Sequence, residues 1–164
     1  MDEDDQYFAF DYEDQIETLF EDFKRLPEVR CSLHAKGNSK RMHDSYNWKL
    51  SDMLLEMKEQ EKDGIFDVAY LDGNHTLAFD GLACWLLKQL VKKGGYLIFD
   101  DVDWSYKKYR ATHPTAFERY TEEQVADCQI KRVINLFMRD DGNFREIYLT
   151  GTLVPSRVVY QRLK

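Results

Sequence analysis

The segment Phe66–Trp104, FDVAYLDGNHTLAFDGLACWLLKQLVKKGGYLIFDDVDW, constrains the fold more than any other part of the chain. It contains a β-rich apolar run, FDVAYLD, then a broad stripe of apolar residues at helical spacing, then a second β-rich run, YLIFDD. A strand, a helix and a strand in so short a segment make a β-α-β unit. Because such a crossover joins parallel strands and is right-handed, the segment predicts an α/β fold with two adjacent parallel strands.

Apolar residues at helical spacing predict further helices on both sides of this unit. Two of them lie over Glu13–Leu26 and around Leu50–Met57. A third begins at Thr121, which forms a capping-box pattern with Gln124, and carries apolar residues as far as Phe137.

Three further segments are predicted to be strands. Val29–Ala35 alternates and indicates a short strand, while FREIYLTGT and SRVVYQRL indicate two closing strands that pair antiparallel. We expect Lys92–Lys93 in the last turn of the central helix, where they favour the helix dipole, and Gly94–Gly95 as the cap of that helix.

The composition limits the class of protein. With 164 residues, of which 43% are hydrophobic, the chain is predicted to form a single domain, 1–164, around one core. Residues 1–14 hold seven acidic residues and no lysine or arginine, which predicts a solvated, frayed arm over residues 1–12. No apolar run approaches the length of a membrane span, and the net charge of -7 argues against nucleic acid as the main partner.

The cysteines and the N-terminus bear on the compartment. Cys31, Cys84 and Cys128 lack the spacing of a metal or redox motif. The first residues, MDEDDQYFAF, are acidic where a signal peptide is basic. We therefore expect reduced, mostly buried cysteines and a cytoplasmic location.

Carboxylates follow both strands of the central unit. Asp72 ends the first strand, and Asp100 and Asp101 end the second. Ligands of open α/β sheets bind beyond the carboxyl ends of the strands, so we expect these three side chains to converge there. A divalent cation would relieve their repulsion, and an all-oxygen ligand set suits Mg²⁺, Mn²⁺ or Ca²⁺ better than zinc. The alternative interpretation is structural: the carboxylates cap the following turns and bind no metal.

His75 lies in the loop that follows Asp72. The side chain of an unperturbed histidine titrates near neutral pH, which makes His75 a candidate general base. The alternative is a helix-start residue that hydrogen-bonds to the backbone. Trp104 either lines the same site or packs in the core.

The segment resembles the second half of class I S-adenosylmethionine-dependent methyltransferases, and most resembles their small-domain, metal-dependent O-methyltransferase-like group. The matching residues are Phe66, Asp67, Asp72, Gly73, Asn74 and His75, then Lys93, Gly94, Gly95, Tyr96, Phe99, Asp100, Asp101 and Trp104. Weaker similarity extends from about Phe20 to Leu163. The resemblance implies a Rossmann-like sheet that is mostly parallel and ends in a C-terminal antiparallel strand pair.

The resemblance also implies a cofactor, S-adenosylmethionine, with Gly37, Asn38 and Ser39 near its adenine and Asp72 among the cofactor-binding residues. The family holds this cofactor with a glycine-rich turn after its first strand and an acid after its second. No Gly-x-Gly occurs in this sequence. The family's strand order is 3-2-1-4-5-7-6, so we expect a sheet that lacks the first one or two strands. A second copy or a partner chain could then complete the sheet.

By the same resemblance Asp72, Asp100 and Asp101 hold a divalent metal such as Mg²⁺. The metal would bind the hydroxyl group of a small-molecule acceptor, lower its pKa and orient it toward the methyl group. Some relatives carry a second acid, the proposed base, where this chain has Asn74. Asn74 cannot take a proton, so the base is either His75, which joins Asp72 as a catalytic residue, or water.

Two other functions are compatible with the residues. YLIFDDVDWS fits the pattern of haloacid-dehalogenase-like phosphatases, with Asp101 as nucleophile and Asp103 as acid and base. The missing glycine-rich turn fits a non-catalytic methyltransferase-like subunit that binds a partner through an open sheet edge.

Overall fold

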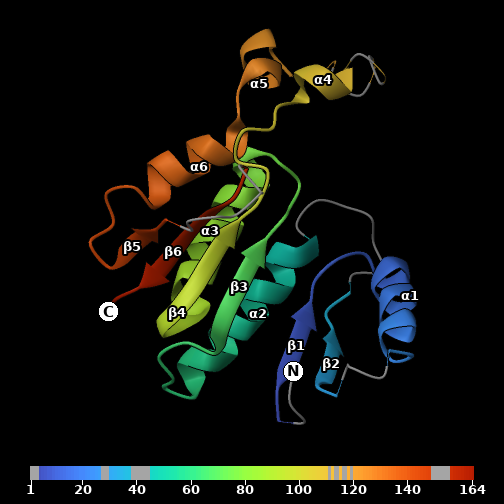
Figure 1. The fold of residues 1–164 in the computed structure, drawn as a ribbon, viewed down its shortest axis with the longest axis vertical. Coiled ribbons are helices and arrows are strands. Elements are labelled where there is room, and N and C mark those ends of the chain that lie inside the picture. The colour runs from blue at the N-terminus through green and yellow to red at the C-terminus, as the bar shows by residue number, and fades with distance from the viewer. Residues whose placement is uncertain are drawn as a thin grey trace. The chain divides into compact units, whose positions relative to one another are not determined.

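The computed structural model describes residues 4–26, 30–37, 45–110, 112, 115, 118, 120–148 and 156–164. The chain divides into two compact units, Met1–Met53 and Leu54–Lys164 (Figure 1). Helix α2 (Ser45–Glu59) begins in the first unit and ends in the second. The single domain predicted over residues 1–164 stays a prediction.

The first unit is a β-α-β arrangement. Strands β1 (Gln6–Ala9) and β2 (Ser32–Ala35) pair in parallel, and helix α1 (Glu13–Phe23) lies between them in the chain. Tyr7 packs against the ring of Phe20 on α1. The prediction of a frayed arm over residues 1–12 is therefore wrong at β1. The backbone of this strand hydrogen-bonds to β2, and the ring of Tyr7 packs on α1.

The second unit contains the predicted central β-α-β segment. It consists of β3 (Phe66–Leu71), α3 (Leu77–Leu90) and β4 (Val91–Phe99), and the two strands run parallel. Along β3 the side chains alternate: Ala69 and Leu71 are buried, whereas Val68 and Tyr70 are exposed. Helix α3 contacts both strands of the unit.

Helix α3 ends earlier than predicted. Val91 is fully buried and opens β4, so the placement of Lys92 in the last turn of the helix is wrong. Lys92 instead donates to both carboxylate oxygens of Asp67, at 3.0 and 2.8 Å. Gly94 has a φ of +82°, and a Cβ on Gly95 would lie 2.8 Å from the carbonyl oxygen of Asp67. The two glycines therefore do not cap the helix but allow an irregular, closely packed start to the strand.

The single helix predicted from Thr121 to Phe137 is two helices, α5 (Glu122–Ala126) and α6 (Gln129–Phe137). The predicted capping box is confirmed: Thr121 accepts the N–H of Gln124 at 3.2 Å, and the side chain of Gln124 accepts the N–H of Thr121 at 2.9 Å. The side chain of the buried Gln129 donates to the carbonyl oxygen of Gln124 at 3.0 Å across the break. This contact gives the non-helical backbone between the two helices a fixed partner.

The strands of the second unit form one sheet in the order β3-β4-β6-β5 (Figure 1). β5 (Phe144–Ile147) and β6 (Val158–Arg162) form the predicted antiparallel pair, and β6 is also antiparallel to β4. The sheet is therefore mixed, with one parallel pair and with β3 at its edge. The predicted α/β class is confirmed, together with the closing antiparallel strands. The prediction of a mostly parallel sheet is wrong for this sheet, because β6 runs antiparallel to both of its neighbours.

Helices lie beside and beyond this sheet. α6 packs on α3, where Gly81 leaves room for the ring of Phe137, 3.3 Å from the position of an added Cβ. Figure 1 shows α4 (Tyr106–Arg110) and α5 beyond the arrowhead ends of β3 and β4. None of the helices described here is both long and apolar enough to cross a membrane.

Candidate functional site

The carboxylates lie at one edge of the sheet because β3 and β4 are parallel and in register. Leu71 is opposite Phe99, and the N–H of Asp100 donates to the carbonyl oxygen of Leu71 at 3.1 Å. The two chains therefore leave the sheet side by side. Asp72 follows the first strand, and Asp100 and Asp101 follow the second, as predicted.

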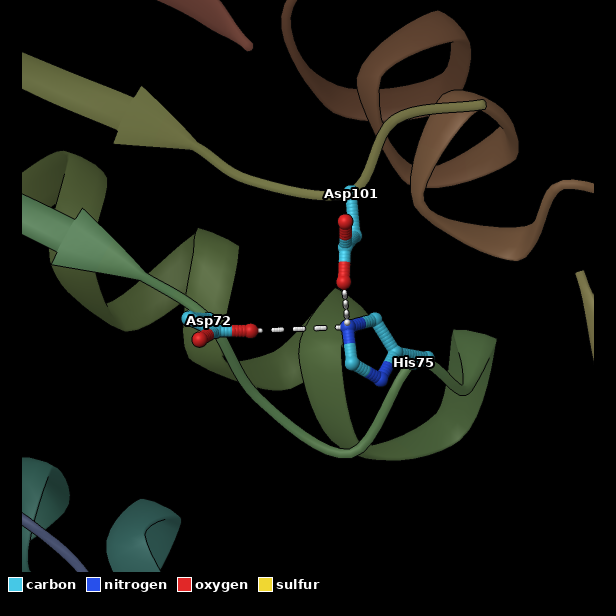
Figure 2. Close-up of side chains that lie close together, drawn as sticks. All are labelled: Asp72, His75 and Asp101. Carbon is cyan, nitrogen blue, oxygen red and sulfur yellow. Dashed lines mark ion pairs between the residues drawn. The ribbon is translucent and has the colours of Figure 1, made fainter. Parts of the chain in front are cut away.

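Two of these carboxylates meet His75, as Figure 2 shows. His75 Nε2 lies 3.5 Å from Asp72 Oδ1 and 3.3 Å from Asp101 Oδ2, and the three ligand atoms all lie within 4.8 Å of one another. The imidazole side chain is 21% exposed, whereas those of Asp72 and Asp101 are 52% and 41% exposed. Nε2 itself is buried and, within the described residues, has no hydrogen-bond partner. We call Asp72, His75 and Asp101 the Asp-His-Asp cluster.

The backbone at this cluster is unusual at two of its three residues. His75 has a φ of 56° and Asp101 a φ of 52°, both in the left-handed region. Each such conformation costs roughly 1–2 kcal/mol for a residue other than glycine. The N–H of Asp101 donates to Asp100 Oδ1 at 2.9 Å. This hydrogen bond favours the backbone conformation that directs the side chain of Asp101 toward His75.

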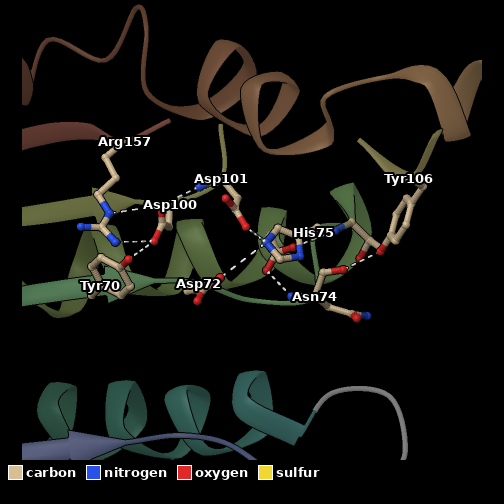
Figure 3. A network of polar contacts seen from close by, with 10 residues as sticks. Tyr70, Asp72, Asn74, His75, Asp100, Asp101, Tyr106 and Arg157 are labelled. Atoms are coloured by element: carbon tan, nitrogen blue, oxygen red, sulfur yellow. Dashed lines mark hydrogen bonds and ion pairs between the residues drawn. The ribbon is translucent and has the colours of Figure 1, made fainter. Parts of the chain in front are cut away.

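Asp100, the third predicted ligand, faces other partners (Figure 3). Its Oδ1 accepts the N–H of Asp101 at 2.9 Å and Arg157 Nε at 3.1 Å, and its Oδ2 accepts Arg157 Nη2 at 3.0 Å and the hydroxyl of Tyr70. An ionised carboxylate has about four lone-pair positions, so these four donors saturate it. The structure therefore brings Asp72 and Asp101 together, and Asp100 stands beside them with its acceptors occupied.

The same contacts perturb the pKa of both partners. Burial alone would raise the pKa of Asp100, but the hydrogen bonds from Arg157 and Tyr70 lower it below the usual value. Partial burial and the neighbouring Asp100 carboxylate raise the pKa of Tyr70 to about 12. Arg157 also stands over the Tyr70 ring, with its guanidinium carbon 5.4 Å from the ring centroid. The group is an ordered ion pair with an aromatic wall.

Sequence reasoning missed Arg157. The antiparallel pairing of β6 with β4, which the sequence analysis did not predict, places Val158 opposite Phe99. Arg157 then follows the register to a position beside Asp100. The side-chain geometry that makes the pair bidentate depends on the folded sheet.

The surroundings of Asp72 shift the pKa of its carboxyl group. Burial raises its pKa above the usual value, and the nearby carboxylates of Asp100 and Asp101 raise it further. His75 and Arg157 act in the opposite direction. A cation placed among these groups would relieve the repulsion between the carboxylates.

Aromatic side chains from the chain after β4 lie at His75, Trp104 in the loop and Tyr106 at the start of α4. The Trp104 ring lies 4.7 Å from the His75 ring, centroid to centroid, and Tyr106 makes an edge contact with Trp104 at 4.8 Å. The hydroxyl of Tyr106 donates to the carbonyl oxygen of Asn74 at 2.6 Å, and burial raises its pKa. Trp104 thus lines the site, one of its two predicted positions.

The remaining predicted residues lie elsewhere. Gly37 lies in the first unit, two residues after β2, while Asn38 and Ser39 are outside the described residues. Asp103, the acid and base of the phosphatase alternative, is exposed and pairs with Lys131 on α6 at 3.2 Å.

The chemistry available to the Asp-His-Asp cluster follows from its donor atoms. Two carboxylate oxygens and one imidazole nitrogen suit a divalent ion such as Mn²⁺, Fe²⁺ or Zn²⁺, and Mg²⁺ less well. Without an ion, an imidazole between two carboxylates can exchange a proton with a bound molecule. Compared with protein-family models and with curated proteins, the sequence gives no match.

Proposed function

We propose that the chain is a methyltransferase-type domain that transfers a methyl group from S-adenosylmethionine to an oxygen of a small molecule, assisted by a divalent metal. The observation that carries the proposal is the strand order β3-β4-β6-β5 with β6 reversed. It corresponds to the 4-5-7-6 half of the order that the sequence resemblance implies. The polar cluster lies at the carboxyl ends of β3 and β4, where ligands of such sheets bind.

The residues proposed to hold the metal are Asp72, His75 and Asp101. Their ligand atoms already face a common point, and His75 Nε2 is a buried nitrogen without a hydrogen-bond partner among the described residues. A divalent ion, when bound, supplies a Lewis acid that lowers the pKa of a hydroxyl group. Asp100 is proposed to support the set through its bond to the N–H of Asp101, since Arg157 and Tyr70 occupy its other acceptor positions.

The cofactor side of the proposal rests on the sequence resemblance. In the family that the sequence resembles, an acid after the second strand binds the cofactor's ribose, and a glycine-rich turn follows the first strand. No Gly-x-Gly in this sequence matches the turn that holds the methionine portion. Cofactor affinity is therefore the part of the proposal to test first.

The test is calorimetry on the full chain. Mn²⁺ is titrated alone, and then S-adenosylhomocysteine is titrated with and without Mn²⁺. We expect Mn²⁺ to bind, His75→Gln to weaken that binding at least about tenfold, and the exposed Asp103→Asn to leave it unchanged. Binding of S-adenosylhomocysteine supports methyl transfer. If neither ligand binds, the proposal is wrong. Hydrolysis of an aryl phosphate that Asp103→Asn abolishes would instead indicate the phosphatase.

A second candidate function is a non-catalytic subunit. The observation that favours it is the edge strand β3, on which Val68 is 56% exposed and Tyr70 is 47% exposed. An edge strand with exposed apolar side chains is a template for pairing with another strand. Stable association without any affinity for S-adenosylhomocysteine would favour this candidate.

A further inference from the structure

A fully buried carboxylate outside the Asp-His-Asp cluster needs an explanation. Asp80 lies in the first turns of α3 and is 0% exposed. Burying a charged group is unfavourable unless hydrogen bonds compensate for the lost water. A carboxylate in this position is therefore expected to form hydrogen bonds that fix the groups it contacts.

Both oxygens of Asp80 accept hydrogen bonds from the loop that leaves β3. Oδ1 accepts the N–H of Asn74 at 3.2 Å, and Oδ2 accepts the N–H of Thr76 at 2.8 Å. These two amides flank His75, whose backbone is in the left-handed region. The carboxylate thus closes a loop around one residue and supports the unfavourable conformation of that residue.

Other contacts hold the same loop at its two ends. The hydroxyl of Tyr106 donates to the carbonyl oxygen of Asn74, and the N–H of Leu77 donates to Gln129 Oε1 at 2.8 Å. Trp104 packs on the imidazole ring. Tyr106 thus holds the peptide bond before His75 and Trp104 contacts its ring, whereas Asp80 bonds the amides of the residues on both sides of His75.

We infer that Asp80 is a positioning residue, which fixes the loop so that His75 Nε2 faces Asp72 and Asp101. The inference deepens the proposed function and rests on it for its consequence in metal binding. A group that orients a ligand typically changes metal affinity by about 10- to 100-fold when it is removed. Asp80 itself contributes no atom to the cluster.

The test compares Asp80→Asn with Asp67→Asn in the full chain. The Asp80→Asn substitution keeps the size of the side chain but presents an NH₂ group to one of the two backbone amides. Asp67 is an exposed residue of β3, and its substitution removes the same charge outside the loop. The readout is the NMR signal of the His75 ring protons, which we expect the ring current of the neighbouring, tilted Trp104 ring to shift away from the position of a free histidine.

We expect Asp80→Asn to move the His75 ring signals toward those of a free histidine, while amide signals of β5 and β6 stay in place. Asp67→Asn should leave the His75 signals unchanged. Unchanged His75 signals in Asp80→Asn would overturn the inference. If Asp80→Asn does not fold, hydrogen exchange in the unmodified protein decides: slow exchange at the Asn74 and Thr76 amides supports the bonds to Asp80, and rapid exchange at both overturns it.

A measurement of Mn²⁺ binding separates this inference from the proposed function. If the unmodified protein binds Mn²⁺, Asp80→Asn should weaken that binding about 10- to 100-fold, and Asp67→Asn should not. Unchanged affinity in Asp80→Asn would overturn the inference while the metal site stands. If the unmodified protein binds no Mn²⁺, the proposed metal site fails, and the His75 signals alone decide the role of Asp80.

Discussion

At the scale of single residues, the site depends on which of two adjacent carboxylates faces which partner. Asp100 and Asp101 are neighbours in the chain, yet one is saturated by Arg157 and Tyr70 and the other faces His75. The left-handed backbone at Asp101 separates their directions. A pair of acids at a strand end thus contains one carboxylate that faces the Asp-His-Asp cluster and one whose bonds serve the structure.

Arg157→Met should destabilise the protein by about 1–3 kcal/mol, because the Asp100 carboxylate, only 12% exposed, loses two of its four donors. The free energy of unfolding in urea at pH 7 measures this. Lys92→Met is the matched control, since it removes a cation that also bonds two carboxylate oxygens, but those of an Asp67 that is 82% exposed. Lys92→Met should lower the free energy of unfolding by less than about 1 kcal/mol. Equal losses would show that Asp100 does not depend on Arg157.

At the scale of elements, one amine joins α3 to the end of α6 and to the turn before β5. Lys88 Nζ lies 2.6 Å from Asp141 Oδ2 and 2.5 Å from the carbonyl oxygen of Phe137, and both charged side chains are less than one-fifth exposed, at 17% and 19%. Lys88 also stands 5.7 Å from the centroid of the Phe144 ring. Lys88 thus links α3 to the end of α6 and to the turn that follows it.

This ion pair predicts a pH dependence. Burial would raise the pKa of Asp141, but the hydrogen bonds from Lys88 and from Asn143 lower it in the folded protein. Stability from this group is therefore complete above the unfolded pKa of about 3.9 and is lost as the pH falls through the lower folded value. Asp141→Asn should cost about 2 kcal/mol at pH 7 and should lose less stability between about pH 5 and 2 than the unmodified protein. Urea unfolding across that range measures both, and parallel curves would contradict the prediction.

The start of β4 predicts a second result at this scale. Gly95→Ala should destabilise the protein by about 1–3 kcal/mol, because the added Cβ would lie 2.8 Å from one carbonyl oxygen and 3.0 Å from another. Gly142→Ala is the control, since nothing lies within 4 Å of its added Cβ, and it should change stability by less than about 0.5 kcal/mol. Thermal unfolding of both variants compares them. A harmless Gly95→Ala would mean that the strand start can relax.

At the scale of the whole molecule, the chain leaves an edge strand with exposed apolar side chains. If β3 pairs with another chain, Val68→Lys should convert an associated form into monomer, because a charge on an edge strand opposes pairing. Size-exclusion chromatography with light scattering measures the mass. Leu136→Lys on α6, at a position that is 62% exposed, is the control and should not change it. Association that survives Val68→Lys would exclude pairing at β3.

The sequence by itself determined the features that depend on short spacings. The period of two residues in strands and of 3.6 in helices places β3, α3 and β4 in order, and parallel strands bring their terminal acids to one edge. The capping box at Thr121 and the closing antiparallel pair follow from equally local chemistry. Residues close together in the sequence determine these features, so they do not depend on the rest of the fold.

Only the tertiary structure decided which side chains meet. Arg157 reaches Asp100 across 57 residues and Tyr70 reaches it across 30, and together they occupy the acceptors of one predicted ligand. Tertiary packing likewise buried Asp80 beneath the His75 loop and started β4 at Val91. The physical reason is that a polar group takes the best partner within reach in the folded chain. Residues distant in the sequence come within reach only when the sheet and its helices have packed.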